Sequence, residues 1–230
     1  MSLDPAELYL TYGRGESLHR PLFTADVYES PDGRRLLVAE HPCAMRKGVS
    51  LADSVLVAPV ATHQVVPLEK WRTGYYDRFP LPAPDADRSI DVAQLGRLER
   101  CQTSELRPER RMSCMSPIGV NLFRQRLIWH LTRFLVPTKH LEDAFGCYYH
   151  EADIIEDCLD LASAAGADVD EAARAIDDAL SEPAGNAQGA HGEDPPSFRD
   201  LLRDPQRRPY VRRSMRVWAQ DRYTAPGQPG

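Results

Sequence analysis

The sequence lacks any apolar run near the roughly 20 residues that a membrane-crossing helix needs. Its first residues, MSLDPAELYL, lack the basic and apolar blocks of a signal peptide. Cysteines are few: five are scattered along 230 residues, and no CxxC pair is present. An odd, scattered set is typical of reduced thiols rather than of a disulfide framework. We therefore predict a cytoplasmic protein without a membrane partner.

Several catalytic motifs are also missing. The chain has no glycine-rich phosphate loop, no GxSxG elbow, no HExxH and no paired-carboxylate motif. Each of these motifs supplies a geometry that its reaction requires, so nucleotide hydrolases, α/β-hydrolases and zincins are poorly supported. Nothing in the sequence calls for a cofactor, and none is predicted.

The residues that are present predict an α+β fold, in which a small antiparallel β-barrel-like unit precedes a helical region. Residues 36–39 and 55–58 are short apolar runs bounded by glycine or proline, as expected for buried strands. The segment SPDG at 30–33 has proline and glycine where a tight turn requires them, which predicts a hairpin. The predicted order is a lead-in at 1–20, the barrel-like unit at 21–80, a proline-rich connector at 81–89, helices at 90–182, a flexible linker at 183–196 and basic terminal helices at 197–224.

Three helices of the predicted helical region have recognisable starts. The first follows the N-cap Ser116 and runs to residue 135. The second follows Thr138 and stops at Gly166, and the third begins at Asp168 with Glu171 three residues later. The apolar stripe of the first helix consists of Val120, Phe123, Leu127, Leu131 and Phe134.

Charge is segregated along the chain although its net value is only -6. Residues 97–133 hold eight arginines against three glutamates, residues 142–182 hold thirteen carboxylates against one arginine, and residues 199–222 hold eight arginines against three aspartates. Helix faces that neutralise one another within the fold explain this pattern. The alternatives are an acidic helical hairpin that masks a basic phosphate-binding surface at 97–133, and a docking site for a basic partner.

The loop between the two predicted strands carries His41, Cys43, Arg46 and Lys47. Functional groups concentrate on loops held by rigid strands, so this loop is a candidate site. Its two cations would lower the pKa of the Cys43 thiol, which favours a nucleophile. His41 and Cys43, together with Cys147 and His150 at helical spacing, would alternatively supply four zinc ligands. The default interpretation is that Cys43 packs in the loop and that no metal binds.

A second candidate is the segment WRTGYYDRF at 71–79, which interleaves aromatic side chains with arginine. Such a mixture suits stacking on unpaired bases, while a covered β-edge uses the same residue types. Two arginines of the first helix lie off its apolar stripe. The candidate nucleic-acid-binding residues are therefore Trp71, Arg72, Tyr75, Tyr76, Arg78, Arg124 and Arg126.

Residues 20–70 resemble the small SH3-like barrel of PemK/MazF-type toxins. The tripeptide ADV at 25–27 matches a Gly-Asp-Val phrase of the family's first strand, and RRLLV at 34–38 matches its arginine-led strand. The segment VAPVAT at 57–62 matches a strand that ends in an apolar-Pro-x-Thr phrase. The chain departs from the family at Ala25, where glycine is usual, and at Thr62, which comes one residue late. The helical half has no counterpart in the family.

The resemblance implies cleavage of single-stranded RNA, without a metal cofactor, in a bacterial stress or antiphage setting. It places Arg34 or Arg35, and Thr62, in catalytic roles. Such cleavage needs a base for the 2′-hydroxyl, a cation for the phosphorane charge and an acid for the leaving oxygen. His41, Arg35 and Arg46 have side chains of the types that these roles require. The alternative is a non-catalytic interaction module whose acidic segment at 142–182 or basic terminal helix docks a protein partner. Catalysis requires Arg35 and Thr62 to share a groove, whereas the interaction module does not.

Overall fold

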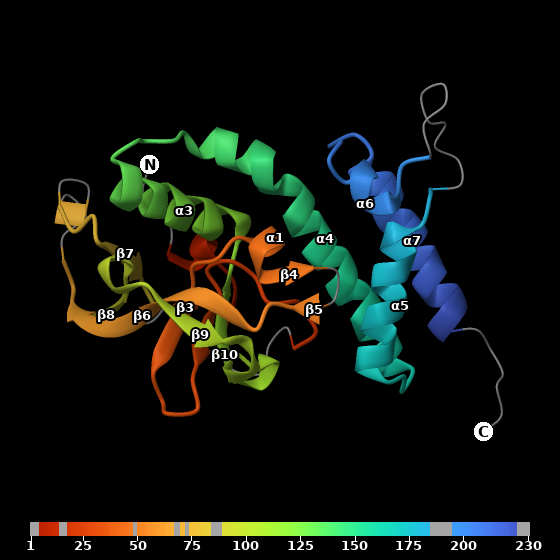
Figure 1. Cartoon of the computed structure of the whole chain (residues 1–230), viewed down its shortest axis with the longest axis horizontal. Coiled ribbons are helices and arrows are strands. Elements are labelled where there is room, and N and C mark those ends of the chain that lie inside the picture. Colours follow the sequence, from red (N-terminus) through yellow and green to blue (C-terminus); the bar gives the residue numbers. More distant parts are fainter. Residues whose placement is uncertain are drawn as a thin grey trace. The chain divides into compact units, whose positions relative to one another are not determined.

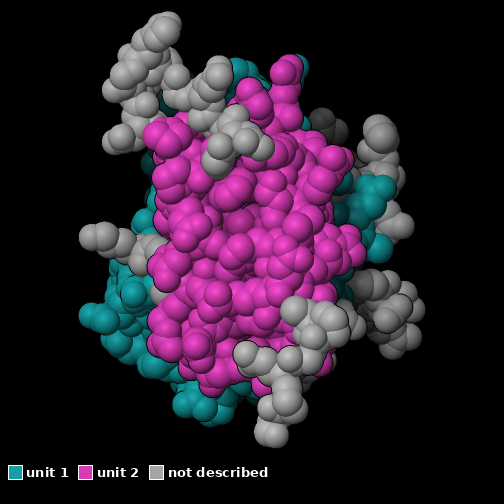
Figure 2. Space-filling view, turned by 90° about the vertical axis from the view of Figure 1, so that its right-hand side faces the viewer, with its two compact units in different colours: residues 1–18, 22–143 teal, residues 19–21, 144–230 magenta. Residues whose placement is uncertain are grey.

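The computed structural model describes residues 5–13, 18–47, 50–66, 70–71, 74–83, 89–184 and 195–224. The chain is α+β, as predicted: an antiparallel sheet that curls into a half-barrel precedes a set of helices (Figure 1). It divides into two compact units. Unit 1 comprises residues 1–18 and 22–143, and unit 2 comprises residues 19–21 and 144–230 (Figure 2).

The main sheet of unit 1 is antiparallel throughout. Its strands are β1 (Tyr9–Tyr12), β2 (Val27–Glu29), β3 (Arg35–Val38), β6 (Ser54–Gln64), β7 (Arg78–Leu81), β8 (Ser89–Gln94), β9 (Glu99–Gln102) and β10 (Arg111–Met115). They follow the order β1-β10-β2-β3-β6-β8-β7, and β9 pairs with the first residues of β6. A separate hairpin, β4 (Arg46–Lys47) and β5 (Ser50–Leu51), follows the short helix α1 (Pro42–Met45). Single 3₁₀ turns are η1 (Pro5–Leu8), η2 (Leu95–Arg97), η3 (Thr103–Glu105) and η4 (Pro108–Arg110).

The predicted hairpin at residues 30–33 is confirmed. β2 pairs with β3 so that Val27 faces Leu37, and Gly33 has the positive φ (+81°) that glycine tolerates. The Gly33 N–H donates to the Ser30 carbonyl oxygen at 2.9 Å. β3 then pairs with β6, which confirms the two predicted buried strands. Their buried side chains include Leu36, Val38, Val55 and Val57.

The sheet is larger than predicted. The prediction of helices from residue 90 is wrong for residues 90–115, which contain β8, β9 and β10. The stretch at 81–89 joins the antiparallel neighbours β7 and β8 instead of separating two domains, and the lead-in at 1–20 holds β1. Each of β8, β9 and β10 is four to six residues long and includes a charged residue. Pairing with distant strands defines such segments, because their local pattern is too short to do so.

Helix α3 (Pro117–Thr132) begins where predicted. The Ser116 hydroxyl oxygen accepts a hydrogen bond from the Gly119 N–H at 3.2 Å and donates one to the Glu7 carbonyl oxygen at 2.6 Å. Glycine is required at 119 because a Cβ there would collide with the Leu8 carbonyl oxygen. The cap therefore fixes the start of α3 against the N-terminal turn η1.

The end of α3 differs from the prediction. The helix stops three residues early, at Thr132, and Arg133 follows with φ +61°. Val120 and Phe123 of the predicted apolar stripe are fully buried, whereas Leu131 and Phe134 are 63% and 76% exposed. Only the first half of the stripe packs in the core of unit 1.

Replacing Arg133 by glycine is expected to stabilise unit 1 by about 0.5–1 kcal/mol, because glycine adopts the left-handed conformation after a helix without steric cost. Urea unfolding of the two chains measures the difference. Leu131→Gly is the control, since residue 131 is exposed but lies within α3, and glycine there is expected to destabilise the unit. Equal shifts for both variants would contradict the argument.

Unit 2 is helical. Its helices are the part of α4 (Thr138–Ala164) beyond residue 143, α5 (Val169–Ser181), α6 (Phe198–Leu201) and α7 (Arg208–Tyr223). Asp168 caps α5 by accepting the Glu171 N–H at 2.8 Å, and Gly166 (φ +77°) follows the end of α4, as predicted. Within the described ranges no helix has the length and apolarity needed to cross a membrane. Residues 185–194 of the predicted linker lie outside the described residues. The core of the unit includes Ile154, Cys158, Ile176, Leu180, Val211 and Met215.

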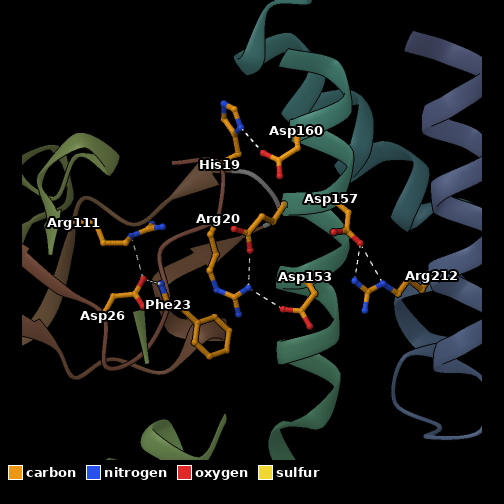
Figure 3. Close-up of polar contacts among 10 residues, drawn as sticks. His19, Arg20, Phe23, Asp26, Arg111, Asp153, Asp157, Asp160 and Arg212 are labelled. Atoms are coloured by element: carbon orange, nitrogen blue, oxygen red, sulfur yellow. Dashed lines mark hydrogen bonds and ion pairs between the residues drawn. The ribbon is translucent and has the colours of Figure 1, made fainter. Parts of the chain in front are cut away.

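Five carboxylates of the acidic segment pair with arginines of unit 2. Arg20 Nη1 donates to Asp153 Oδ1 and to Glu156 Oε2, each at 2.8 Å (Figure 3). Further pairs join Arg212 to Asp157, and Arg199 to Glu151 and Asp177. These carboxylates are already engaged. For these five side chains the pairing agrees with the prediction of helix faces that neutralise one another within the fold.

His150 of α4 makes the stability of unit 2 sensitive to acid. Burial, together with the charges of Arg208 and Arg212, lowers the pKa of its imidazole, against the opposing effect of Asp153. The folded chain therefore binds this proton less readily than the unfolded chain, whose histidine pKa is about 6.5. The stability contributed by neutral His150 is present above that pH and decreases as the pH falls toward the folded pKa.

We expect the unfolding midpoint of unit 2 to decrease less between pH 7.5 and 5.5 in a His150→Gln variant than in the unchanged chain. The measurement is urea unfolding at several pH values, followed by helical circular dichroism. His140→Gln is the control, because His140 is an exposed histidine of the same helix. An unchanged pH slope in His150→Gln would contradict the expectation.

Candidate functional site

Unit 1 contains a groove of about 180 Å³ on the curled sheet. Every strand of the path from β1 to β7 contributes a residue to its lining. The lining residues are Tyr9, Tyr12, Gly13, Val27, Arg35, Val60, Leu81, Asp91, Met112 and Ser113. The curl of the sheet thus brings residues that are far apart in sequence to one place.

Arg35 and Asp91 line this groove, and Thr62 contacts both of them. Arg35 faces Val60 in the β3–β6 pair, and Thr62 faces Asp91 in the β6–β8 pair. Because strand side chains alternate with period two, Val60 and Thr62 point to one side of the sheet, with Arg35 and Asp91. Strand pairing alone therefore places these side chains together.

The three side chains form a closed hydrogen-bonded set. Arg35 Nη2 donates to Thr62 Oγ1 at 3.0 Å, and the Thr62 hydroxyl donates to Asp91 Oδ1 at 3.0 Å. Arg35 Nη1 pairs with Asp91 Oδ2. The guanidinium and the carboxylate are 28% and 27% exposed, so both remain accessible from the groove. The set offers a cation, a carboxylate and a hydroxyl to a ligand.

Two tyrosines of β1 complete the groove. The pairing of β1 with β10 shifts register between Tyr9 and Thr11, and the rings of Tyr9 and Tyr12 meet edge-on with centroids 5.0 Å apart. The Tyr9 hydroxyl is buried and has no hydrogen-bond partner among the described residues. Burial raises its pKa, with smaller contributions from Tyr12 and Asp91. Tyr9 therefore remains protonated at neutral pH and can donate a hydrogen bond to a bound anion.

The structure does not bring the other predicted catalytic residues to Arg35 and Thr62. Arg34 pairs with Asp32 and with Glu99, each at 2.7 Å. His41 caps α1: its Nδ1 accepts the Cys43 N–H at 3.2 Å and lies 2.7 Å from the Cys43 Sγ. Arg46 is half-buried in β4. These three side chains do not line the groove.

His41 is a neutral partner for Cys43. Burial and the charge of Arg124 lower the pKa of the imidazole, against the effect of Glu40. Cys43 is exposed, whereas burial raises the pKa of the Cys101 and Cys158 thiols to about 11 and about 12. The described residues contain no group of three or more His, Cys, Asp or Glu side chains that could hold a metal ion. The zinc alternative therefore lacks a ligand set in the described part of the chain.

The predicted aromatic and arginine residues pack mainly on one another. Trp71 is 7% exposed and donates its indole N–H to the Val66 carbonyl oxygen at 3.2 Å. Arg78 lies over the Tyr75 ring at 5.4 Å, and Arg126 lies over the Tyr76 ring at 5.2 Å. These contacts fit the covered-edge alternative for the segment.

Two further arginines belong to the predicted nucleic-acid-binding residues. Arg124 is half-buried in α3, where its charge acts on His41. Arg72 lies outside the described residues.

Asp91, Tyr9 and Tyr12 were not among the predicted site residues. Asp91 lies in SIDVAQ, a segment predicted as helix, and the two tyrosines lie in the predicted lead-in. The family resemblance covers residues 20–70 and therefore includes none of the three. Asp91 is a charged residue in the middle of a short apolar segment, and this was the one local sign in the sequence that it belongs to a site.

Comparison with family models, with curated protein sequences and with solved structures finds no match to this chain.

Proposed function

We propose that the groove of unit 1 binds single-stranded RNA and cleaves its backbone. The observation that carries this proposal is the 3.0 Å hydrogen bond between Arg35 and Thr62, the residues to which the PemK/MazF resemblance gives catalytic roles. Ala25 adds support, because its φ of +70° is the conformation that favours the glycine usual in that family. The half-barrel sheet is also compatible with the SH3-like barrel that the resemblance implies.

The groove residues match the steps of RNA cleavage by a ribose 2′-oxygen. In the proposed reaction, Asp91 accepts the proton of the 2′-hydroxyl as its oxygen attacks the adjacent phosphorus. Arg35 stabilises the negative charge on the phosphorane oxygens. Tyr9 donates its proton to the departing 5′-oxygen of the next nucleotide. The products are a 2′,3′-cyclic phosphate and a free 5′-hydroxyl.

Thr62 is a positioning residue in this scheme. Its hydroxyl accepts from Arg35 and donates to Asp91, so it fixes the cation and the base relative to each other. In the free groove Arg35 and Asp91 neutralise one another. A phosphate that enters the groove competes with Asp91 for the guanidinium, which leaves the carboxylate free to act as a base.

The size and rim of the groove favour an unpaired strand. A volume of about 180 Å³ is too small for a duplex. Tyr12 is 46% exposed at the groove and offers a ring face for stacking with an unpaired base. The proposed substrate is therefore a single-stranded segment in which one base stacks on Tyr12.

The experiment compares neighbouring arginines. We expect the unchanged chain and an Arg34→Ala variant to cleave a labelled single-stranded RNA at the same rate, with or without EDTA. Arg35→Ala is expected to lower the rate about 100-fold, because it removes a cation that acts on developing charge. Arg34 is the matched control, since it is the adjacent arginine and pairs with Asp32 and Glu99 away from the groove. Equal rates for the two variants would overturn the proposal.

A further inference from the structure

A second cavity of unit 1, with a volume of about 650 Å³, has features that the proposed RNA site does not use. It is lined by residues of α3, β7 and β8, and α3 lies along that side of the sheet (Figure 1). Its aromatic walls are Trp71, Tyr76, Phe79 and Trp129. Pockets for small organic molecules typically have about 300–1,000 Å³ and mostly apolar walls with a few polar groups. The volume and the lining both fall in that class.

Arg126 brings a positive charge to the wall of this cavity. Its guanidinium is half-buried and donates to the carbonyl oxygens of Gly74, Tyr75 and Arg78 at 2.9–3.1 Å. Removal from water lowers its pKa, and no carboxylate of the described residues forms an ion pair with it. Asp77, whose charge opposes that shift, pairs with Arg78 at 3.8 Å. An anion stabilises a cation that is partly removed from water.

Trp129 adds a hydrogen-bond donor to the same wall. Its Nε1 is buried and has no hydrogen-bond partner among the described residues. Arg126 and Trp129 are three positions apart on α3, and Leu122 lies one turn before Arg126, so the three share one helix face. The Tyr76 ring centroid is 5.2 Å from the Arg126 guanidinium and 5.7 Å from the Trp129 ring. The charge and the free donor are therefore neighbours.

We propose that this cavity binds a small organic acid, with one carboxylate on an apolar chain or ring. The apolar body fills the space beside Trp71, Ile90 and Leu122, and the carboxylate accepts the Trp129 N–H and offsets the charge of Arg126. A neutral ligand leaves that charge uncompensated, and a cation is repelled by it. Inorganic phosphate leaves the apolar walls without a partner. The chemistry of the cavity therefore selects an amphipathic monocarboxylate.

The test is isothermal titration of the full chain with four probes: decanoate, 1-decanol, decylamine and inorganic phosphate. Decanoate is expected to bind with one-to-one stoichiometry. Decanol has the same apolar chain without the charge and is expected to bind at least tenfold more weakly. Decylamine and phosphate are expected not to bind. Affinity for decanol equal to that for decanoate would overturn the assignment of an acid.

Variants test whether binding takes place in this cavity. Trp129→Phe keeps an aromatic ring but removes the donor, so we expect decanoate affinity to fall about tenfold and decanol affinity to fall less, because a neutral hydroxyl is the weaker acceptor. Leu122→Trp fills the space and is expected to abolish binding of both. Arg126 is left intact because it also holds three carbonyl groups. Trp218→Phe in unit 2 is the control, since Trp218 does not line the cavity.

Each variant is first compared with the unchanged chain by thermal unfolding, so that loss of the fold is recognised. Decanoate affinity that is unchanged in both folded variants, Trp129→Phe and Leu122→Trp, would overturn the proposal. The decanoate affinity does not depend on whether unit 1 cleaves RNA. Arg35 lies in the other groove, and an inactive Arg35→Ala chain is still expected to bind decanoate.

Discussion

Replacing Arg111 by methionine is expected to lower the free energy of unfolding of unit 1 by about 3–5 kcal/mol, the cost of leaving one partner of a buried ion pair behind. Arg111 and Asp26 are each 2% exposed as side chains, and their Nε and Oδ2 atoms lie 3.4 Å apart (Figure 3). Arg111 Nε also donates to the Tyr28 hydroxyl at 2.7 Å, and Asp26 Oδ2 accepts the Phe23 N–H at 3.2 Å. Without the guanidinium, the Asp26 carboxylate stays buried and loses the cation that offsets its charge.

Urea unfolding, combined with hydrogen exchange of the β2 and β10 amides, separates this effect from the unfolding of unit 2. Arg34→Met is the control, because Arg34 belongs to exposed ion pairs and its loss is expected to leave the midpoint nearly unchanged. A second substitution, Asp26→Asn in the Arg111→Met chain, is expected to recover part of the loss by removing the orphaned charge. If Arg111→Met is as stable as Arg34→Met, the buried pair is not the source of stability that we describe.

Replacing Arg20 by methionine is expected to destabilise unit 2 by about 2–3 kcal/mol, less than a fully buried pair because water still reaches the carboxylates. Arg20 is 5% exposed, while Asp153 and Glu156 are 34% and 21% exposed. One guanidinium nitrogen separates these two like charges on α4, so its removal also leaves them to repel each other. The loss of one residue at position 20 therefore affects a helix more than 130 positions away.

The measurement is urea unfolding followed by the circular dichroism of the helical unit. Arg212→Met provides a matched comparison, since it removes the same side chain from a pair whose members are 51% and 45% exposed. We expect that variant to shift the midpoint much less, because exposed pairs contribute little. Comparable shifts for Arg20→Met and Arg212→Met would show that burial of Arg20 does not decide the effect.

Local features were predictable from the sequence. The hairpin at Gly33 and the caps Ser116 and Asp168 depend on contacts within four residues, so their residue types are informative by themselves. The strands β8, β9 and β10 were missed because each depends on a partner strand far away in sequence. The fold class was correct, whereas the extent of the sheet was not.

The site was predictable only in part. Thr62 and Arg35 entered the prediction through a family resemblance, but Asp91 lies 29 and 56 residues from them. Its role follows from the β6–β8 register, which no local pattern contains. His41 and Arg46 were chosen because they lie on the loop between the two predicted strands. In the structure this loop forms a short helix and a separate hairpin, so a shared loop did not bring them to the groove.

The register of β8 restricts which insertions and deletions this strand tolerates. Asp91 faces Thr62 and reaches the groove, while the adjacent Ile90 faces His63 and lines the apolar cavity. An insertion or deletion of one residue within β8 would exchange these faces, because strand side chains alternate. The carboxylate would then enter the apolar cavity, and isoleucine would meet Arg35. Substitutions in β8 can alter one cavity at a time, but a change in its length damages both.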